Sequence, residues 1–180
     1  MTFKPLLAPG EDPMSFPDYF KKIQYPLLCS PKYDGIRNVV KHGRCLSRSG
    51  KMLPSFQVQE EFSHLADLDG ELIEGNPTDF DVYNRTQSHV MSEDKPGDLK
   101  FFVFDNTAEH MLNKPFYERF ESILIPANAT NIEIVMHELV ENYDELLAFE
   151  NRCLEEGFEG IMMRSPIGHY KQGRGTFREG

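Results

Sequence analysis

The segment Lys-Tyr-Asp-Gly-Ile-Arg at residues 32–37 constrains this chain more than any other feature. It offers an amine nucleophile at Lys32, a glycine at Gly35 against which a nucleotide can lie, and a cation at Arg37 for phosphate. An amine attacks phosphorus only when it is unprotonated, so a catalytic lysine needs desolvation or nearby positive charge to lower its pKa from about 10.4. We expect Arg37 and a bound metal to supply that charge. The segment predicts nucleotidyl transfer, and a surface turn is the plain alternative.

The segments around this motif predict a fold rich in strands. We expect a hairpin around His42-Gly43, because apolar stretches flank this pair on both sides. Strands in clusters with intervening helices indicate one α+β domain with antiparallel sheets, a nucleotide cleft between the sheets and helices at the periphery. The expected strands are 26–30, 36–40, 44–47, 72–73, 99–104 and 133–139, and the expected helices are 16–23, 57–65, 117–124 and 143–156, the last ended by Gly157.

Length and composition allow one ordinary domain, because 180 residues with 39% hydrophobic content are enough to build a packed core. The sequence has no apolar run of about 18 residues and no signal peptide, so we expect a cytoplasmic protein, in the host cytoplasm if it is viral, without membrane contact. The three cysteines, Cys29, Cys45 and Cys153, suit neither a disulfide framework nor a four-ligand zinc site. We expect them to be reduced thiols in the core.

The charge distribution is more informative than the net charge of -10. Cations are concentrated in two stretches, 30–51 and 164–178, and both stretches adjoin motifs. These clusters favour phosphate contacts, although two solvated surface strands would look the same. The clustered cations are Lys32, Arg37, Lys41, Arg44, Arg48, Lys51, Arg164, Lys171, Arg174 and Arg178.

Five further segments carry polar or aromatic groups suited to a nucleotide site. Taken singly, each has an ordinary reading as a hairpin, a core strand, a turn or a surface loop. Asp69, in the second of them, is expected to be structural. The segments are 46–51 with Arg48, 68–72 with Glu71, 101–105 with Phe104, 156–164 with Glu159, and the basic, glycine-rich loop 169–176 with Arg174.

In this order, the six segments resemble those of covalent nucleotidyltransferases, the superfamily of ATP-dependent DNA ligases, RNA ligases and mRNA capping enzymes. The run Tyr-Lys-Gln-Gly-Arg at 170–174 and the opening Lys-Pro-Leu-Leu-Ala at 4–8 are similar to the small viral and phage ATP-dependent DNA ligases. The resemblance spans nearly the entire chain and implies the fold of an adenylation domain.

The resemblance also implies roles for the catalytic groups. Lys32 would attack the α-phosphate of ATP and become a lysyl-AMP, with Arg37 and Glu159 as further catalytic residues. Glu159 would hold a divalent metal or the lysine, and Mg²⁺ would neutralise phosphate charge, with Glu71 as a second metal ligand.

The same resemblance implies how ATP and DNA are contacted. Glu71 would accept hydrogen bonds from the ribose hydroxyls, and Phe104 would stack on adenine. Arg48 would touch the ribose and the phosphate at a nick, and Arg174 the nucleotide phosphate or the 5′-phosphate of the nick. The expected partners are ATP and nicked double-stranded DNA, bound by a monomer acting in DNA repair, replication and recombination.

The sequence departs from the family at its end. The family carries a further strand with two lysines after the Gly-Arg loop and then an OB-fold domain, whereas this sequence stops at Gly180. Residues 1–180 are thus expected to form an adenylation domain that ends before its last lysine-bearing strand and lacks the OB-fold, and we expect this chain alone to fail at sealing nicks. The alternatives are a non-catalytic nucleotide- or nick-binding fragment that needs a partner, and an RNA ligase. A serine hydrolase built on Ser47 or Ser49 is the third alternative, and it lacks a persuasive His and Asp partner in the sequence.

Overall fold

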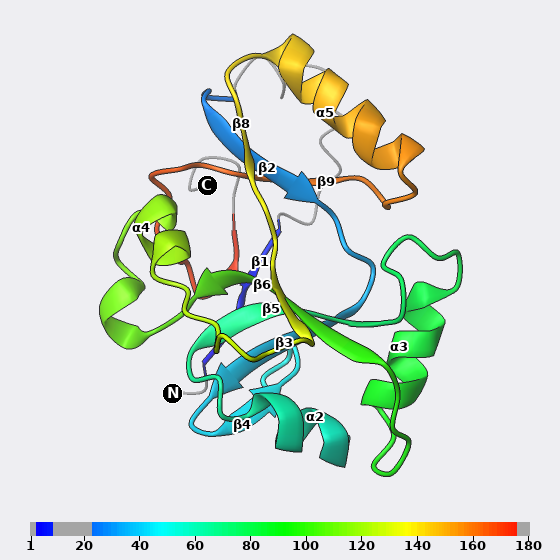
Figure 1. Cartoon of the computed structure of the whole chain (residues 1–180). Coiled ribbons are helices and arrows are strands. Elements are labelled where there is room, and N and C mark those ends of the chain that lie inside the picture. The colour runs from blue at the N-terminus through cyan, green and yellow to red at the C-terminus, as the bar shows by residue number, and fades with distance from the viewer. Residues whose placement is uncertain (1–2, 9–22, 176–180) are drawn as a thin grey trace.

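The computed structural model describes residues 3–8 and 23–175, and it has the expected α+β architecture (Figure 1). Two separate sheets dominate it, one of five strands and one of three. In Figure 1, helix α5 (Tyr143–Glu155) covers the smaller sheet at the top, whereas α2 (Phe56–Phe62) and α3 (Val82–Val90) lie against the larger sheet. The buried side chains form three clusters, and the segment around residue 32 connects the two sheets.

The five-stranded sheet has the order β4-β3-β5-β6-β7 and is antiparallel except at its edge, where β7 runs parallel to β6. The expected antiparallel sheets are thus found with one parallel edge strand. The expected hairpin joins β3 and β4, and His42 (φ 52°) and Gly43 (φ 68°) both take the positive φ that a tight two-residue turn requires. The strands of the five-stranded sheet are β3 (Ile36–Lys41), β4 (Arg44–Leu46), β5 (Leu68–Glu74), β6 (Leu99–Asn106) and β7 (Ile132–Ile134).

The three-stranded sheet has the order β8-β2-β9 and is antiparallel throughout. Helix α5 buries Leu146, Phe149 and Cys153 against this sheet. Asn142 caps the helix by accepting a hydrogen bond from the Glu145 backbone N–H. The strands are β2 (Leu27–Pro31), β8 (Glu138–Val140) and β9 (Ile161–Arg164), and Gly157 (φ 96°) follows the helix as expected.

The single strand expected at 133–139 is wrong. This stretch forms β7 in the large sheet and β8 in the small one, so the chain crosses from one sheet to the other between them. At the crossing, His137 packs its ring against Phe116 and Phe120, at centroid distances of 5.1 and 4.8 Å. Alternating side chains fit either one strand or two, and the partner strands decide between these possibilities.

Two helices differ from the expectation in other ways. Helix α3 was not predicted, because it buries only Val82, Thr86 and Val90, a narrow stripe at four-residue spacing, and its N-cap residue makes no side-chain hydrogen bond. The helix expected at 16–23 lies almost wholly outside the described residues. Helices α2, α4 (Phe116–Glu121) and α5 match their expected positions to within a few residues, and a short 3₁₀ turn, η2, covers Glu109–Met111.

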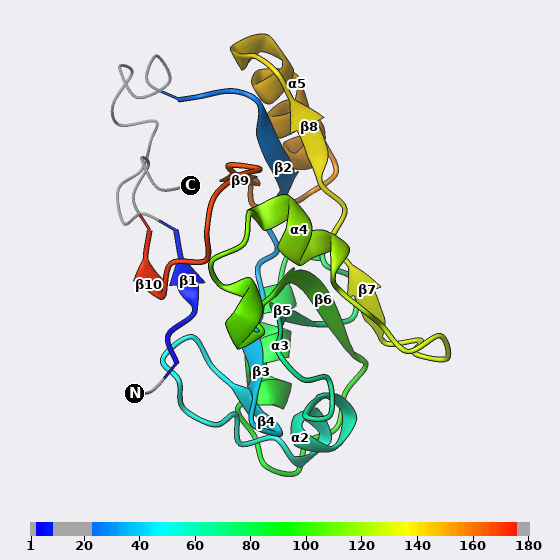
Figure 2. The ribbon, with the colours of Figure 1, turned by 90° about the vertical axis from the view of Figure 1, so that its left-hand side faces the viewer.

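The first and last described segments pair with each other. Strand β1 (Leu6–Leu7) runs parallel to β10 (Gly173–Arg174), and Figure 2 shows this two-stranded ribbon on one side of the molecule. The three cysteines are buried and free, as expected. Within residues 3–8 and 23–175, no helix is long and apolar enough to cross a membrane.

Candidate active site

Lys32 and Glu159 form an ion pair although 127 residues separate them along the chain. Lys32 directly follows β2 and Glu159 lies in the turn before β9, so the pairing of Pro31 with Ile161 brings the two side chains together. The Lys32 Nζ atom lies 2.6 Å from Glu159 Oε1, and the Lys32 backbone N–H donates to the Gly160 carbonyl oxygen at 2.9 Å. The two side chains are 43% and 48% exposed, so this pair faces solvent.

Glycines shape both segments that carry this pair. Gly160 has a φ of 157° and Gly157 one of 96°, values that residues with a Cβ rarely adopt. Gly35 has another reason, because a Cβ there would lie 2.2 Å from the Leu72 carbonyl oxygen and 2.5 Å from Ile73 Cδ1. Close packing of the motif on β5 therefore requires a glycine at position 35, and the nucleotide contact expected there stays a prediction.

The group in contact with Lys32 is the Glu159 carboxylate, and the lysine is one of the two partners that the family resemblance implies for that residue. Arg37, which we also expect to supply positive charge to the amine, is paired with another carboxylate. Attack on phosphorus would require Lys32 to separate from Glu159 and its amine to be unprotonated.

Arg37 is instead locked to Asp69. The Arg37 Nε and Nη2 atoms donate to the two Asp69 carboxylate oxygens at 2.6 and 2.8 Å. The Arg37 side chain is 15% exposed and that of Asp69 is fully buried. Burial alone would lower the pKa of Arg37, but the Asp69 carboxylate raises it above its ordinary value. A bidentate pair of this kind fixes the plane of the guanidinium.

Glu71 lies directly opposite Arg37 on the neighbouring strand. Burial raises the pKa of Glu71 to about 8, although the charge of Arg37 acts in the opposite direction. At pH 7 its carboxyl group is therefore mostly protonated, so it can donate a hydrogen bond to a ribose hydroxyl as well as accept one.

Phe104 lies on the same face of the sheet, beside two guanidinium groups. The Cζ atoms of Arg37 and Arg164 are 4.6 and 5.0 Å from its ring centroid. Arg164 is held in turn by Asp105, whose Oδ2 atom accepts from Arg164 Nη1 at 2.7 Å. The sequence reasoning counted Arg164 only as one of a cluster of cations. The alternation of β6 could have predicted this face of the sheet, because it turns Phe102 and Phe104 to this face and Phe101 to the core on the other.

Asp34 connects the Lys32–Glu159 ion pair electrostatically with Arg37 and Glu71. Burial and the negative charge of Glu159 raise its pKa, and the positive charge of Lys32 lowers it. The charge of Asp34 in turn raises the pKa of Glu71. The Lys32–Glu159 ion pair therefore shares one electrostatic environment with Arg37 and Glu71.

Arg48 and Arg174 are both exposed and lie on different elements. Arg48 occupies the turn after β4. Its charge lowers the pKa of Glu71, so Arg48 lies within electrostatic reach of that carboxyl group. Arg174 belongs to β10, where its Nη1 atom donates to the Ala8 carbonyl oxygen at 3.4 Å. These positions are compatible with contacts to phosphate.

Four cations of the two predicted clusters form ion pairs inside the protein: Lys32, Arg37, Lys41 and Arg164. Lys41, for example, is buried and donates to Asp67 Oδ1 at 2.6 Å and to the Thr107 carbonyl oxygen. Besides the half-exposed Lys32, the exposed cluster members in the described part of the chain are Arg44, Arg48, Lys51 and Arg174, and Arg178 lies outside it.

Magnesium is compatible with the carboxylates present. In the described residues no three His, Cys, Asp or Glu side chains converge as a ready-made metal site. Magnesium at phosphate sites is commonly held by one or two carboxylates together with the phosphates themselves. Glu159 is half-exposed and could meet a hydrated ion, whereas Glu71, the other predicted ligand, lies opposite Arg37 on the neighbouring strand.

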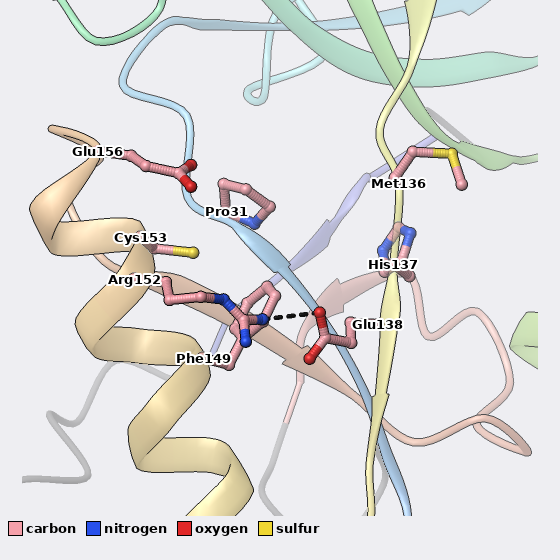
Figure 3. Close-up of a pocket in the computed structure, with 8 residues that line it drawn as sticks. All are labelled: Pro31, Met136, His137, Glu138, Phe149, Arg152, Cys153 and Glu156. Carbon is pink, nitrogen blue, oxygen red and sulfur yellow. Dashed lines mark hydrogen bonds and ion pairs between the residues drawn. The ribbon is translucent and has the colours of Figure 1, made fainter.

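A cavity of about 420 Å³ lies elsewhere, between α5 and β8 (Figure 3). The Arg152–Glu138 ion pair, at 2.7 Å, spans it. None of the predicted site residues lines this cavity, and Pro31 is its only link to the lysine motif. Its lining residues are Pro31, Met136, His137, Glu138, Phe149, Arg152, Cys153 and Glu156.

The fold and the order of these groups define a nucleotidyltransferase domain, and the sequence comparison specifies which one. The family model described as ATP dependent DNA ligase domain matches residues 5–176. The chain therefore belongs to the ATP-dependent DNA ligase family. A search of curated protein sequences gives no match.

Solved structures agree with this assignment. The chain is similar to the DNA ligase-adenylate of Chlorella virus, with 31% identity and a TM-score of 0.78 over 100% of this chain and 67% of that one. Two others share the fold at lower identity: the ligase domain of LigD from M. tuberculosis (20% identity, TM-score 0.63, 96% of this chain and 57% of that one) and the ATP-dependent DNA ligase of bacteriophage T7 in complex with ATP (18%, 0.61, 96% and 66%). The chain thus spans about two thirds of the length of the viral ligase.

Proposed function

We propose that this chain is an adenylation domain that forms a covalent lysyl-AMP at Lys32 and passes the AMP to the 5′-phosphate of nicked DNA. The observation that carries the proposal is the contact between Lys32 and Glu159 in a chain of the ATP-dependent DNA ligase family. The similar viral structure is itself a ligase-adenylate, which supports ATP as the source of the nucleotide.

The first step is attack by the Lys32 Nζ atom on the α-phosphorus of ATP. The N–P bond forms as the bond from the α-phosphorus to the bridging oxygen breaks, and pyrophosphate leaves with that electron pair. The amine must give up a proton before it attacks, and Glu159 Oε1, at 2.6 Å, is the acceptor in contact with it. Mg²⁺, when bound, would neutralise the charge of the phosphates.

The later steps move the AMP from nitrogen to oxygen. A 5′-phosphate oxygen displaces Lys32 from the phosphorus, which gives an adenylated DNA end, and the neighbouring 3′-hydroxyl then displaces AMP and forms the phosphodiester bond. In this proposal three groups orient the nucleotide: Glu71 hydrogen-bonds the ribose, and Phe104 stacks on the adenine with Arg37 beside it. Arg48 and Arg174 contact phosphate from the exposed side.

Mass spectrometry of the chain after incubation with ATP and magnesium tests the first step. We expect one AMP adduct on the unmodified chain and none on Lys32→Ala, because a methyl group cannot attack phosphorus. Lys51→Ala is the matched control, since Lys51 is another exposed lysine of the same cluster and should leave the adduct unchanged. An adduct that survives in Lys32→Ala would place the nucleophile elsewhere.

A non-catalytic nucleotide- or nick-binding fragment is the second candidate, favoured by the ion pair in which Glu159 occupies the Lys32 amine. It predicts saturable binding of ATP or nicked DNA without any adduct. Transfer of AMP to nicked RNA rather than nicked DNA would indicate an RNA ligase instead. The monomeric state, the cytoplasmic location and the roles in DNA repair, replication and recombination stay predictions from the sequence.

A further inference from the structure

Four groups far apart in the sequence close a ring of hydrogen bonds beside Arg37. The Leu6 backbone N–H donates to the Tyr170 hydroxyl oxygen at 2.9 Å, and that hydroxyl donates to Asp69 Oδ2 at 2.7 Å. The Arg37 Nη2 atom donates to the same Asp69 oxygen at 2.8 Å and to the Leu6 carbonyl oxygen at 3.1 Å. Both backbone groups of Leu6 are thus used, and the ring returns to its starting residue.

The ring has a fixed direction because Tyr170 and Asp69 are buried and its other two members, Leu6 and Arg37, are partly buried. Tyr170 is 5% exposed and Asp69 is fully buried, so water does not easily replace a lost partner. The Tyr170 hydroxyl has a single proton, and it must point to Asp69 because the contact with Leu6 uses the N–H as donor. A buried donor or acceptor left without a partner is costly, so each member has few alternatives.

The ring joins two parts of the molecule that bear predicted phosphate-binding groups. Leu6 belongs to β1, which pairs with Gly173 of β10, and Arg174 follows directly. Arg37 belongs to β3 and lies opposite Glu71. The aromatic ring of Tyr170 is fixed by Phe3, whose ring is stacked on it at a centroid distance of 5.8 Å.

We propose that Tyr170 is a positioning residue, which orients Arg37 through Asp69 and locks the β1–β10 ribbon to the same guanidinium. Without the hydroxyl, Asp69 keeps its pair with Arg37 but loses the third donor that fixes the carboxylate, and the Leu6 N–H loses its acceptor. The Arg37 guanidinium then moves more freely beside Glu71 and Phe104. The consequence for adenylation rests on the proposed function, whereas the effect on Arg37 does not.

Hydrogen exchange at the Arg37 Nε–H, observed by NMR, tests the positioning directly. Tyr170→Phe should speed this exchange, and that of the Leu6 amide, about fivefold or more, since one buried hydrogen bond is lost on each side. Arg37→Lys identifies the signal by removing it. Tyr25→Phe is the matched control, because the buried Tyr25 hydroxyl has no hydrogen-bond partner, and it should change neither rate. Unchanged exchange at Arg37 in Tyr170→Phe would overturn the proposal.

The unmodified chain gives a second measurement, which needs no variant to fold. A hydroxyl proton held in this ring should give its own NMR signal with a cross-peak to the Leu6 amide proton. The absence of that cross-peak in a spectrum where the Leu6 amide is assigned would also overturn the proposal.

A double-mutant cycle on the rate of lysyl-AMP formation tests the functional consequence. Tyr170→Phe should slow adduct formation at saturating ATP, and it should add nothing in an Arg37→Lys background, because Tyr170 acts through Arg37. Equal slowing in both backgrounds would contradict the proposed route. If the unmodified chain forms no adduct at all, the proposed function fails, while the exchange rates still decide whether Tyr170 positions Arg37.

Discussion

The two ion pairs of the site have the same length and opposite surroundings. Lys32–Glu159 and Arg37–Asp69 both measure 2.6 Å between their closest atoms. The first faces solvent with both side chains more than 40% exposed, whereas Asp69 in the second is fully buried. An exposed pair contributes about 0–1 kcal/mol, but removing one partner of a buried pair costs about 3–5 kcal/mol.

Under the proposed function, this difference separates a group that has to move from a group that has to stay. A nucleophile must leave its carboxylate and reach phosphorus, so a weak, solvated pair at Lys32 suits reaction. A cation that orients a nucleotide gains from having one conformation, and the bidentate contact with Asp69 gives Arg37 that rigidity. Distance alone would have described both pairs in the same way.

The largest predicted difference between the two pairs is in stability. Asp69→Ala should lower the free energy of unfolding by about 3–5 kcal/mol, because it leaves the Arg37 charge unpaired in the interior. Glu159→Ala, the matched removal of the exposed carboxylate, should lower it by less than about 1 kcal/mol. Urea denaturation followed by circular dichroism measures both. Equal effects would remove the distinction between the pairs.

The next effect concerns ligand binding on the buried side. Phe104→Ala should weaken ATP binding by about 1–3 kcal/mol if the ring stacks on adenine, as a lost base–aromatic contact generally does. Phe80→Ala is the control, because Phe80 is also a phenylalanine but is fully exposed. Isothermal titration with ATP measures both affinities. An unchanged affinity in folded Phe104→Ala would make Phe104 a packing residue for Arg37 and Arg164 only.

Glu71 should make stability depend on pH between its ordinary pKa of 4.5 and its raised pKa of about 8. Over that range the folded chain holds a proton on Glu71 that the unfolded chain has lost. Stability therefore falls as the pH rises, by at most about 1.4 kcal/mol per pH unit, and levels off above pH 8. Thermal unfolding of the unmodified chain and of Glu71→Gln measures the difference. The opposite slope would show that Arg37 outweighs burial at Glu71.

The smallest effects belong to the exposed cations. Arg48→Ala and Arg174→Ala should each weaken binding of nicked duplex DNA modestly and lower the slope of log affinity against log salt by about 1, as expected for one lost phosphate contact. Both should leave stability nearly unchanged, because neither side chain is buried. Fluorescence anisotropy at several salt concentrations gives the slope. An unaltered slope would exclude that arginine from the phosphate contacts.

The local elements and the identity of several functional groups can be predicted from the sequence. It predicted the hairpin at His42-Gly43, the long helix before Gly157 and the α+β class, because turn preferences and amphipathic periodicity are properties of neighbouring residues. It also singled out Lys32 and Glu159, and named the lysine as one possible partner of that carboxylate. The order of the motifs was sufficient for the family, which the match over residues 5–176 establishes.

How those groups are paired and charged depends on contacts made in the folded chain. The split of 133–139 between two sheets depends on which strands accept it, and alternation within the stretch carries no such information. The partner of Arg37 is 32 residues away and that of Tyr170 is 101 residues away. The protonated state of Glu71 follows from its burial beside Arg37 and Asp69. A pattern of residues names the chemistry that is available, whereas charge state and orientation depend on contacts and desolvation, which exist only in the folded chain.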